Sequence, residues 1–303
     1  MDRRTYLKSG IGVLGGGLIA GCTGDGGSGD QATTTTAESE METETEVTTD
    51  PTATTEATAE STIPDTVLIG SDIPYRPFEY QTAEGDLTGF DVDIAAAVFE
   101  EQIGIDYEFQ ATSFDSIIPS LNNGNFRVIM SAMTINDQRD EEVDFSDPYF
   151  TAYQTIIVRT DSSISSRAVL EGEVVGVQKG TTGAGAAEEL QEEFGGDLEI
   201  NSYDQINGAF QALTNGQVNA VINDNTVNAE RANQDDGLRF VEGDGVAADS
   251  DQEAPPYLTL TSENYGIAFR EDDDEFLERV NDALAAIREN GTYDEIYSEY
   301  FSG

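Results

Sequence analysis

Few side chains in this sequence can carry out nucleophilic or acid–base chemistry. The 303 residues include no histidine and a single cysteine, Cys22. The chain therefore has no Ser-His or Cys-His pair and no histidine-ligated zinc. One cysteine also cannot form an internal disulfide. The side chains left for a functional site are carboxylates, arginines, amides and hydroxyls, and no metal site or cofactor is expected.

Three features of the sequence could bind a charged ligand: Arg139, the loop 179–183 and Asp224. Arg139 offers a planar fork for a carboxylate, although its acidic neighbours equally suit an exposed ion pair. The loop 179–183, with the sequence KGTTG, precedes a helix whose first amides can hold an anion. Asp224 follows the apolar run 220–222, but it is one of 49 acids in residues 63–303.

An alternation of strands and helices must position these residues. The βαβαβ order of the first unit predicts a mostly parallel sheet with helices on both faces. A second α/β unit follows, and the last strand and helix return to the first. We expect strands at 66–70, 107–110, 126–132, 155–158, 174–177, 220–222 and 265–269, and helices at 92–99, 115–121, 184–194, 206–214 and 275–289. The pattern predicts an α/β bilobal clamshell with its ligand site between the lobes.

Residues 1–22 are interpreted as an export signal. Arg3 and Arg4 precede the apolar stretch 11–20, which is too short to span a bilayer, as in a twin-arginine signal. The stretch ends in LIAGC, a lipobox pattern that predicts lipidation of Cys22; an accidental cysteine is the alternative. These features predict a lipid-anchored protein on the extracellular face of the cell membrane.

Residues 23–62 differ in composition from the rest of the chain. They hold ten acids, fourteen threonines and no lysine or arginine, with few large apolar side chains. Such a segment cannot bury enough surface to fold, so we expect a disordered tether. The expected domains are lobe 1 at 63–148 plus 266–303, lobe 2 at 154–260, and a two-strand hinge at 149–153 and 261–265.

The net charge of −46, from 60 acidic and 14 basic residues, is extreme. It would repel a phosphate backbone, which argues against nucleic-acid partners. An acidic, lysine-poor surface stays hydrated when molar salt screens its self-repulsion, and the balance resembles that of haloarchaeal proteins. Binding of Ca²⁺ or a basic partner is the alternative explanation.

Several motifs together resemble the polar-amino-acid-binding family of extracellular solute-binding proteins of ABC importers (family 3). The match covers nearly all of residues 63–303, in order, and within the family it is most similar to glutamine-binding proteins. The motifs are SDIPYRPFEY at 71–80, GFDVDI at 89–94, FDSIIP at 114–119, MTINDQR at 133–139, DFSDPY at 144–149 and RENGTYDEIY at 288–297. The resemblance implies a type II binding-protein fold.

The resemblance also implies a role for each site residue. Arg139, Thr134 and the backbone amide of Thr182 would bind the ligand carboxylate, and Asp224 with the carbonyl of Ala132 would bind its ammonium. Tyr75 and Phe114 would enclose the ligand side chain, and Asp72 would read its polar end. Gln178 and Asn223 stand where glutamine-binding proteins carry a lysine and a histidine. The full set of expected ligand-binding residues is Asp72, Tyr75, Phe114, Ala132, Met133, Thr134, Arg139, Gln178, Thr182, Asn223 and Asp224.

By this resemblance the chain captures a polar L-amino acid as a monomer and delivers it to an ABC permease driven by a separate ATPase. Glutamine is favoured, and basic amino acids are possible because the pocket holds an extra acid. We expect no enzymatic activity. Two alternatives are a cyclohexadienyl or arogenate dehydratase-like cleft enzyme of the same fold and a ligand-sensing subunit for signalling.

Overall fold

A computed structural model describes residues 63–249 and 254–301. The expected signal at 1–22, with Cys22, and the expected tether at 23–62 lie outside the described residues. Within the described part of the chain, no helix combines the length and hydropathy needed to cross a membrane.

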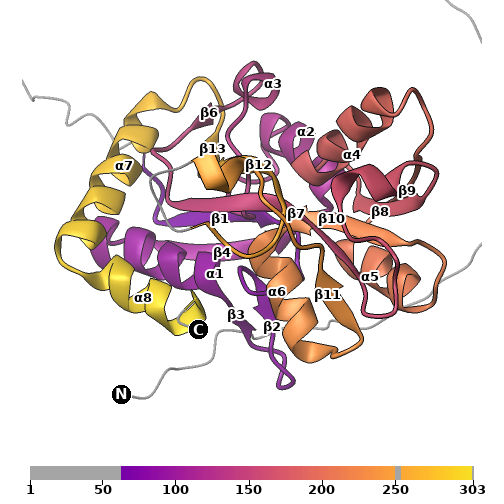
Figure 1. The fold of residues 1–303 in the computed structure, drawn as a ribbon. Helices are drawn as coiled ribbons and strands as arrows, with labels where there is room; N and C mark the ends of the chain where they lie inside the picture. Colours follow the sequence, from indigo (N-terminus) through magenta and orange to yellow (C-terminus); the bar gives the residue numbers. More distant parts are fainter. Residues whose placement is uncertain (1–62, 250–253, 302–303) are drawn as a thin grey trace, which may run out of the picture. The chain divides into compact units, whose positions relative to one another are not determined.

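The first lobe is built on a five-stranded mixed sheet in the order β4-β1-β5-β13-β6 (Figure 1). The first three strands in that order run parallel, whereas β13 is antiparallel to both of its neighbours. A small β2–β3 hairpin lies beside the sheet. The strands are β1 (Thr66–Ser71), β2 (Tyr80–Gln81), β3 (Leu87–Thr88), β4 (Asp106–Ala111), β5 (Val128–Ile129), β6 (Asp144–Phe145) and β13 (Ala268–Phe269).

Helices from both ends of the described chain complete this lobe. The C-terminal pair α7 and α8 packs against the α1 segment (Figure 1). Apolar residues of α7 such as Phe276, Val280 and Leu284 are buried, as its periodicity predicts. The helices are α1 (Phe90–Ala95), which continues as a π-helix (Ala96–Ile103), α2 (Ile117–Asn122), α3 (Asp137–Asp140), α7 (Asp274–Glu289) and α8 (Thr292–Phe301).

The second lobe holds a six-stranded sheet in the order β11-β7-β10-β8-β9, with β12 also paired to β7. Strand β8 runs parallel to β9 and β10, and β7 is antiparallel to its three partners. The elements are β7 (Phe150–Arg159), β8 (Val174–Gln178), α4 (Thr182–Glu193), β9 (Glu199–Tyr203), α5 (Ile206–Thr214), β10 (Ala220–Asp224), α6 (Asn225–Gln234), β11 (Leu238–Phe240) and β12 (Thr259–Tyr265).

The chain passes between the two sheets twice, from β6 into β7 and from β12 into β13. Strands β7 and β12 pair from Phe150↔Tyr265 to Tyr153↔Ser262, so the two passages lie side by side. Strand β13 makes the first sheet mixed, and the antiparallel pairing of β7 with its three partners makes the second sheet mixed. This corrects the expectation of a mostly parallel sheet. The expected strand at 126–132 is also shorter, because only Val128 and Ile129 join the ladder.

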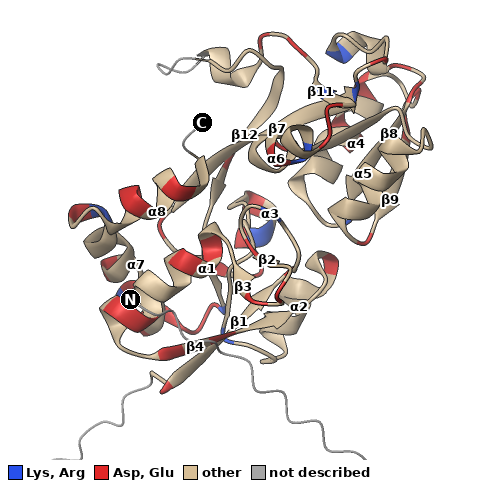
Figure 2. Cartoon of the chain, turned by 90° about the horizontal axis from the view of Figure 1, so that it is seen from below, with Lys and Arg blue, Asp and Glu red and all other residues tan. Residues whose placement is uncertain are grey.

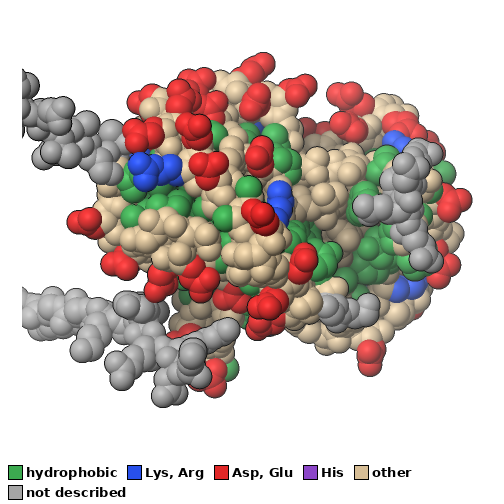
Figure 3. Space-filling model, turned by 90° about the vertical axis from the view of Figure 1, so that its left-hand side faces the viewer, with side chains coloured by type: hydrophobic (Ala, Val, Ile, Leu, Met, Phe, Trp, Pro, Cys, Tyr) green, Lys and Arg blue, Asp and Glu red, His purple; other side chains and the backbone are tan. Residues whose placement is uncertain are grey.

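Acidic residues are distributed over both lobes rather than gathered at one place (Figure 2). The face drawn in Figure 3 carries acidic side chains scattered among other types, with few lysines or arginines. This distribution is the one expected of a uniformly hydrated acidic surface.

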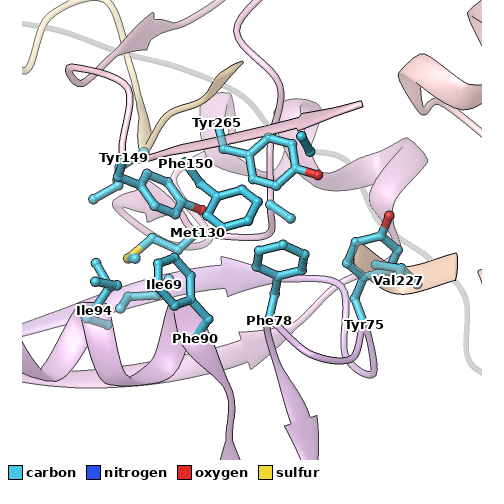
Figure 4. Packing of buried hydrophobic residues seen from close by; sticks show 14 of the residues in the cluster. Ile69, Tyr75, Phe78, Phe90, Ile94, Met130, Tyr149, Phe150, Val227 and Tyr265 are labelled. Atoms are coloured by element: carbon cyan, nitrogen blue, oxygen red, sulfur yellow. The ribbon is translucent and has the colours of Figure 1, made fainter. Parts of the chain in front are cut away.

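A cluster of aromatic side chains lies where the first lobe meets the two passages. Phe78 packs edge-on against Phe150 and Tyr265, with ring centroids 5.2 and 5.4 Å apart, and Phe90 packs against Phe150 at 5.3 Å (Figure 4). Phe301 of α8 contacts Phe150 at 4.8 Å. Offset and edge-on pairs of this kind stabilise beyond their area burial. The cluster thus ties the α8 end of the chain to the base of β7.

Candidate functional site

A cavity between the lobes collects most of the expected site residues. It has a volume of about 330 Å³, including space open to solvent. Its walls come from the loops after β1 and β5, from α3, and from the ends of β8 and β10 with the start of α4. The lining residues are Asp72, Tyr75, Phe114, Ser131, Ala132, Thr134, Arg139, Gln154, Gln178, Thr181, Thr182, Asn223 and Asp224.

Arg139 is turned into the protein by the short helix α3. The Asn136 side chain accepts a hydrogen bond from the Arg139 backbone N–H (2.9 Å) and so caps the helix. The guanidinium donates to Thr134 O (2.7 Å) and, across the cleft, to Gly180 O (3.2 Å). It is 8% exposed, and among the described residues it has no ion-pair partner within 4 Å. The alternative of an exposed ion pair is therefore wrong.

Burial lowers the pKa of Arg139, and the charges of Glu263 and Asp224 oppose that shift. An arginine nevertheless keeps its proton under ordinary conditions. The site therefore holds one desolvated positive charge that an anionic group can pair with.

The KGTTG loop forms the start of α4 on the second lobe. Gly180 has φ +73°, a conformation open to glycine, and Thr181 caps the helix by accepting from Ala184 N (3.2 Å). Thr182 Oγ1 lies 3.4 Å from Thr134 Oγ1 of the first lobe. Lys179 points elsewhere and pairs with the exposed Asp204. The anion-binding feature of this loop is therefore the helix N-terminus and not the lysine.

Asp224 ends β10 and is 6% exposed. It accepts hydrogen bonds from the Tyr75 hydroxyl of the first lobe and from Gln154 Nε2. Asn223 Oδ1 lies 3.0 Å from the same Tyr75 hydroxyl. Burial raises the pKa of Asp224 to about 6, an effect that its hydrogen bonds from Tyr75 and Gln154 partly offset.

Asp72 follows β1 and faces the second lobe, where Gln178 Nε2 donates to it. Burial raises its pKa to about 6, and hydrogen bonds from Gln178 and Gln205 partly offset the shift. Phe114 lies under Arg139, with the guanidinium carbon 5.2 Å from the ring centroid. Ala132, with φ +45°, contributes its backbone to the wall.

Of the expected site residues, only Met133 does not line the cavity. Its side chain is fully buried in an apolar cluster with Ile117, Phe126 and Val143. Its carbonyl accepts from Gly266 N (3.0 Å), so it supports the wall and does not form it. Met133 follows directly on wall residues in the sequence, which is why the motif included it.

Three lining residues were not anticipated: Ser131, Gln154 and Thr181. Thr181 belongs to the quoted KGTTG loop, so its position was visible in the sequence. Gln154 gives no such signal, since it lies within β7 as part of the buried run 154–158.

Comparison with known proteins shows which family the chain belongs to. Its sequence matches the bacterial extracellular solute-binding proteins, family 3, over residues 67–187 and 171–303. The chain belongs to this family. A relative from Neisseria gonorrhoeae, described as a probable histidine-binding protein, is 34% identical over 238 residues, covering 77% of this chain and 82% of the relative.

Three solved structures of amino-acid-binding proteins resemble this chain. An ancestral arginine-binding protein bound to arginine has a TM-score of 0.70 at 35% identity, covering 78% of this chain and 99% of that one. An ancestral arginine-binding protein bound to glutamine gives 0.69 at 34%, covering 80% and 100%. An ancestral amino acid-binding protein, described as a precursor of cyclohexadienyl dehydratase, gives 0.67 at 36%, covering 78% and 96%. The expected fold class, two α/β lobes of the type II binding-protein kind, is confirmed.

Proposed function

We propose that the chain is the extracellular receptor subunit of an ABC importer and binds a polar L-amino acid between its lobes. The observation that carries this proposal is that Arg139, Asp224 and Asp72 line one cavity, with acid groups contributed by both lobes. An amino acid brings one carboxylate and one ammonium, and each must be paired when water is excluded.

In this proposal the ligand carboxylate lies between the Arg139 guanidinium, the Thr134 hydroxyl and the Thr182 amide at the start of α4. The ammonium lies against Asp224 and the Ala132 carbonyl. Arg139 and Asp224 come from opposite lobes, so a ligand that pairs with both favours the closed arrangement of the lobes. We propose the segments 149–153 and 261–265 as the hinge, because β7 and β12 are the paired passages between the sheets.

The side-chain end of the cavity favours a basic amino acid. After Arg139 and Asp224 are paired with the ligand backbone, Asp72 remains as a second buried acid, which hydrogen-bonds to an amide and to no cation among the residues that the structure describes. A cationic ligand side chain would compensate it. The histidine-binding relative and the arginine-bound ancestral protein support this choice. Glutamine stays a second candidate, because its amide can donate to Asp72, and the glutamine-bound ancestral protein supports it.

The experiment is calorimetric titration of the purified protein in molar KCl with L-arginine, L-lysine, L-histidine and L-glutamine. We expect a basic amino acid to bind most tightly and to raise the unfolding temperature through its preference for the folded state. If none of the four binds, the remaining amino acids are titrated in the same way, and binding of none of the twenty would overturn the proposal.

A catalytic function is the rival suggested by the cyclohexadienyl dehydratase precursor. A dehydratase would need a carboxylate free for proton transfer beside those that pair the ligand, and Asp72 is the residue of the cavity that could serve. We propose a binding protein and no enzyme, since Asp72 has a role in compensating the ligand. Release of product from a cyclohexadienyl acid by the purified protein would contradict this. Coupling to a permease and ATPase, as opposed to a signalling partner, is tested by reconstituted uptake.

We also propose that the monomeric protein is exported by the twin-arginine route and anchored through a lipid on Cys22. The support is the sequence: Arg3 and Arg4 precede an apolar stretch that ends at the chain's single cysteine. The Cys22→Ala variant should move from the membrane to the soluble fraction of its cells, because a lipid chain is lost. Unchanged membrane association would show that the anchor lies elsewhere.

A further inference from the structure

Two carboxyl groups are buried directly behind the cavity wall and do not line it. Glu79 lies just before β2 and Asp91 lies in the first turn of α1; both are 0% exposed. Among the described residues, no hydrogen bond or ion pair joins either carboxyl to an arginine or lysine. Burying a carboxyl group without a positively charged partner destabilises the folded state, so we expect both acids to have a functional role.

Each carboxyl holds one of two adjacent residues of the wall, Ser131 or Ala132. Ser131 Oγ donates to Glu79 Oε1 (2.8 Å) and accepts from the backbone N–H of Asp72 (2.9 Å). Asp91 Oδ2 accepts from the backbone N–H of Ala132 (2.8 Å), and the Tyr149 hydroxyl also donates to Asp91 (2.9 Å). The buried acids thus reach the backbone of two residues proposed to contact the ligand, Ala132 directly and Asp72 through Ser131.

Ala132 has φ +45°, which costs an alanine roughly 1 kcal/mol or more unless its surroundings fix it. The bond from its amide to Asp91 fixes one side of this residue. Its carbonyl, the proposed ammonium acceptor, lies on the other side. Loss of the amide bond would therefore free the carbonyl to turn away.

We propose that Asp91 and Glu79 form a positioning pair in which ionised Asp91 fixes Ala132 and neutral, protonated Glu79 fixes Ser131 and, through it, Asp72. This inference rests on the proposed amino-acid site. It assigns opposite protonation states to two neighbouring buried acids, and so opposite responses to amide substitution.

The hydrogen bonds of the two carboxyl groups explain why Asp91 is ionised and Glu79 is protonated. Asp91 receives two donors, the Ala132 amide and the Tyr149 hydroxyl, which favour its charged form. Glu79 receives one donor, and its Oε2 is buried without a hydrogen-bond partner among the described residues. Burial raises the pKa of both groups, and raises that of Glu79 well above its ordinary value, with the charges of Asp91 and Asp72 adding to the shift. Asp91 in turn faces Tyr149 and Glu79.

The test compares Glu79→Gln with Asp91→Asn by calorimetry, using L-arginine or the amino acid that binds most tightly to the wild type. Glutamine can replace a protonated glutamic acid, so Glu79→Gln should bind within about threefold of wild type. Asp91→Asn keeps one oxygen for the Ala132 amide, but it removes the negative charge and puts an NH₂ group beside the Tyr149 hydroxyl. It should weaken binding by about 10- to 100-fold, the loss expected for a hydrogen bond to a charged group. Unfolding temperatures measured on the same samples report any loss of the fold.

A pH series gives a readout that a purely structural role would not move. As pH rises through the raised pKa of Glu79, a second negative charge forms behind the wall beside Asp91 and Asp72, and the affinity of the wild type should change. Glu79→Gln lacks that proton and should keep its affinity over the same range. The ratio of the two proteins cancels the titration of the ligand itself.

Three results would overturn the positioning pair. These are unchanged affinity in Asp91→Asn, equal losses in the two variants, and parallel pH profiles for wild type and Glu79→Gln. If Asp91→Asn does not fold, Tyr149→Phe replaces it; this variant removes one donor and should weaken binding several-fold, and unchanged affinity counts against the pair. A wild type that binds no amino acid would instead overturn the proposed function, and the pair with it.

Discussion

Asp72 and Asp224 differ in what they face across the cavity, although burial raises the pKa of both to about 6. Asp224 meets hydroxyl and amide groups at the end of β10, near the charge of Arg139. Asp72 meets the amide of Gln178. Both acids are largely ionised at neutral pH, so the side chains that line the cavity carry two negative charges and one positive charge. This balance suits a ligand with a net charge of +1.

The Asp72→Asn variant tests whether the negative charge of Asp72 makes the cavity prefer a ligand with a net charge of +1. At pH 7.5 its affinity for L-arginine should fall about 30-fold or more, because one partner of a desolvated charge pair is removed. Its affinity for L-glutamine should change much less. In the wild type the arginine-to-glutamine affinity ratio should fall as pH drops below 6, where Asp72 gains a proton. Titration of Asp224 affects both ligands through their common ammonium, so the ratio isolates Asp72. A ratio that neither the variant nor pH alters would exclude Asp72 as the specificity residue.

The resemblance to the binding-protein family located most of the cavity residues, because residue type alone left Asp224 as one of 49 acids and Arg139 equally suited to an exposed ion pair. Arg139 lies in α3 and Asp224 is the last residue of β10. Asp72 and Tyr75 lie in the SDIPYRPFEY motif that carries the resemblance. Glu79 and Asp91 were inside the quoted motifs without a role. Their function depends on contacts to Ser131 and Ala132, 41 to 52 positions away, which spacing cannot reveal.

Among the elements, the N-terminus of α4 can lie close to β7 and β10 only because residue 183 is a glycine. A methyl group at Gly183 would lie 2.9 Å from Gln154 Oε1 and 3.0 Å from Ile222 O. Gly185, two residues on in the same helix, has open space around its Cβ position. Gly183 therefore lets the N-terminus of α4 approach β7 and β10, which brings the Thr182 amide to the cavity.

These two glycines form a matched pair for substitution. Gly183→Ala should lower the free energy of unfolding by about 1–3 kcal/mol through overpacking and weaken arginine binding, because Gln154 and α4 must shift. Gly185→Ala should raise it by about 0.5–1 kcal/mol and leave binding unchanged, since alanine is the better helix former. Chemical denaturation and calorimetry on both variants check the pair. Equal effects of the two substitutions would contradict the proposed close approach.

Elements with a clear apolar pattern were the ones that could be predicted. The helix expected at 206–214 is α5 with the same bounds, since its buried face alternates regularly with exposed residues. Helix α6 was not anticipated: it carries mostly polar residues and buries Val227 and Asn228. The run 126–132 was expected to be one strand, but Ser131 and Ala132 leave the ladder to bind Glu79 and Asp91. Side-chain partners of the cavity wall override the strand propensity there.

For the whole molecule, charge is the dominant feature outside the cavity. Residues 63–303 hold 49 acids and 11 basic residues, and the acids are spread over both lobes (Figure 2). Several of the ion pairs between described residues are exposed, such as Arg279 with Glu275 and Arg167 with Glu193, so they contribute little to stability. Like-charge repulsion therefore opposes the compact state in dilute buffer. We propose that the protein works in concentrated salt, which screens that repulsion.

Stability should accordingly rise with salt. Between 0.1 and 2 M KCl the screening length falls from about 10 Å to below about 3 Å, and we expect the unfolding temperature to rise by roughly 10 °C or more. Salt also strengthens apolar burial, so a charge variant is the control. Glu188, Glu189 and Glu192 are exposed acids on α4, a helix with no basic residue. Replacing all three with glutamine should raise stability at 0.1 M KCl and reduce the slope with salt, because less repulsion remains to be screened. An unfolding temperature that is independent of KCl, or a variant with an unchanged slope, would exclude charge repulsion as the reason for a salt requirement.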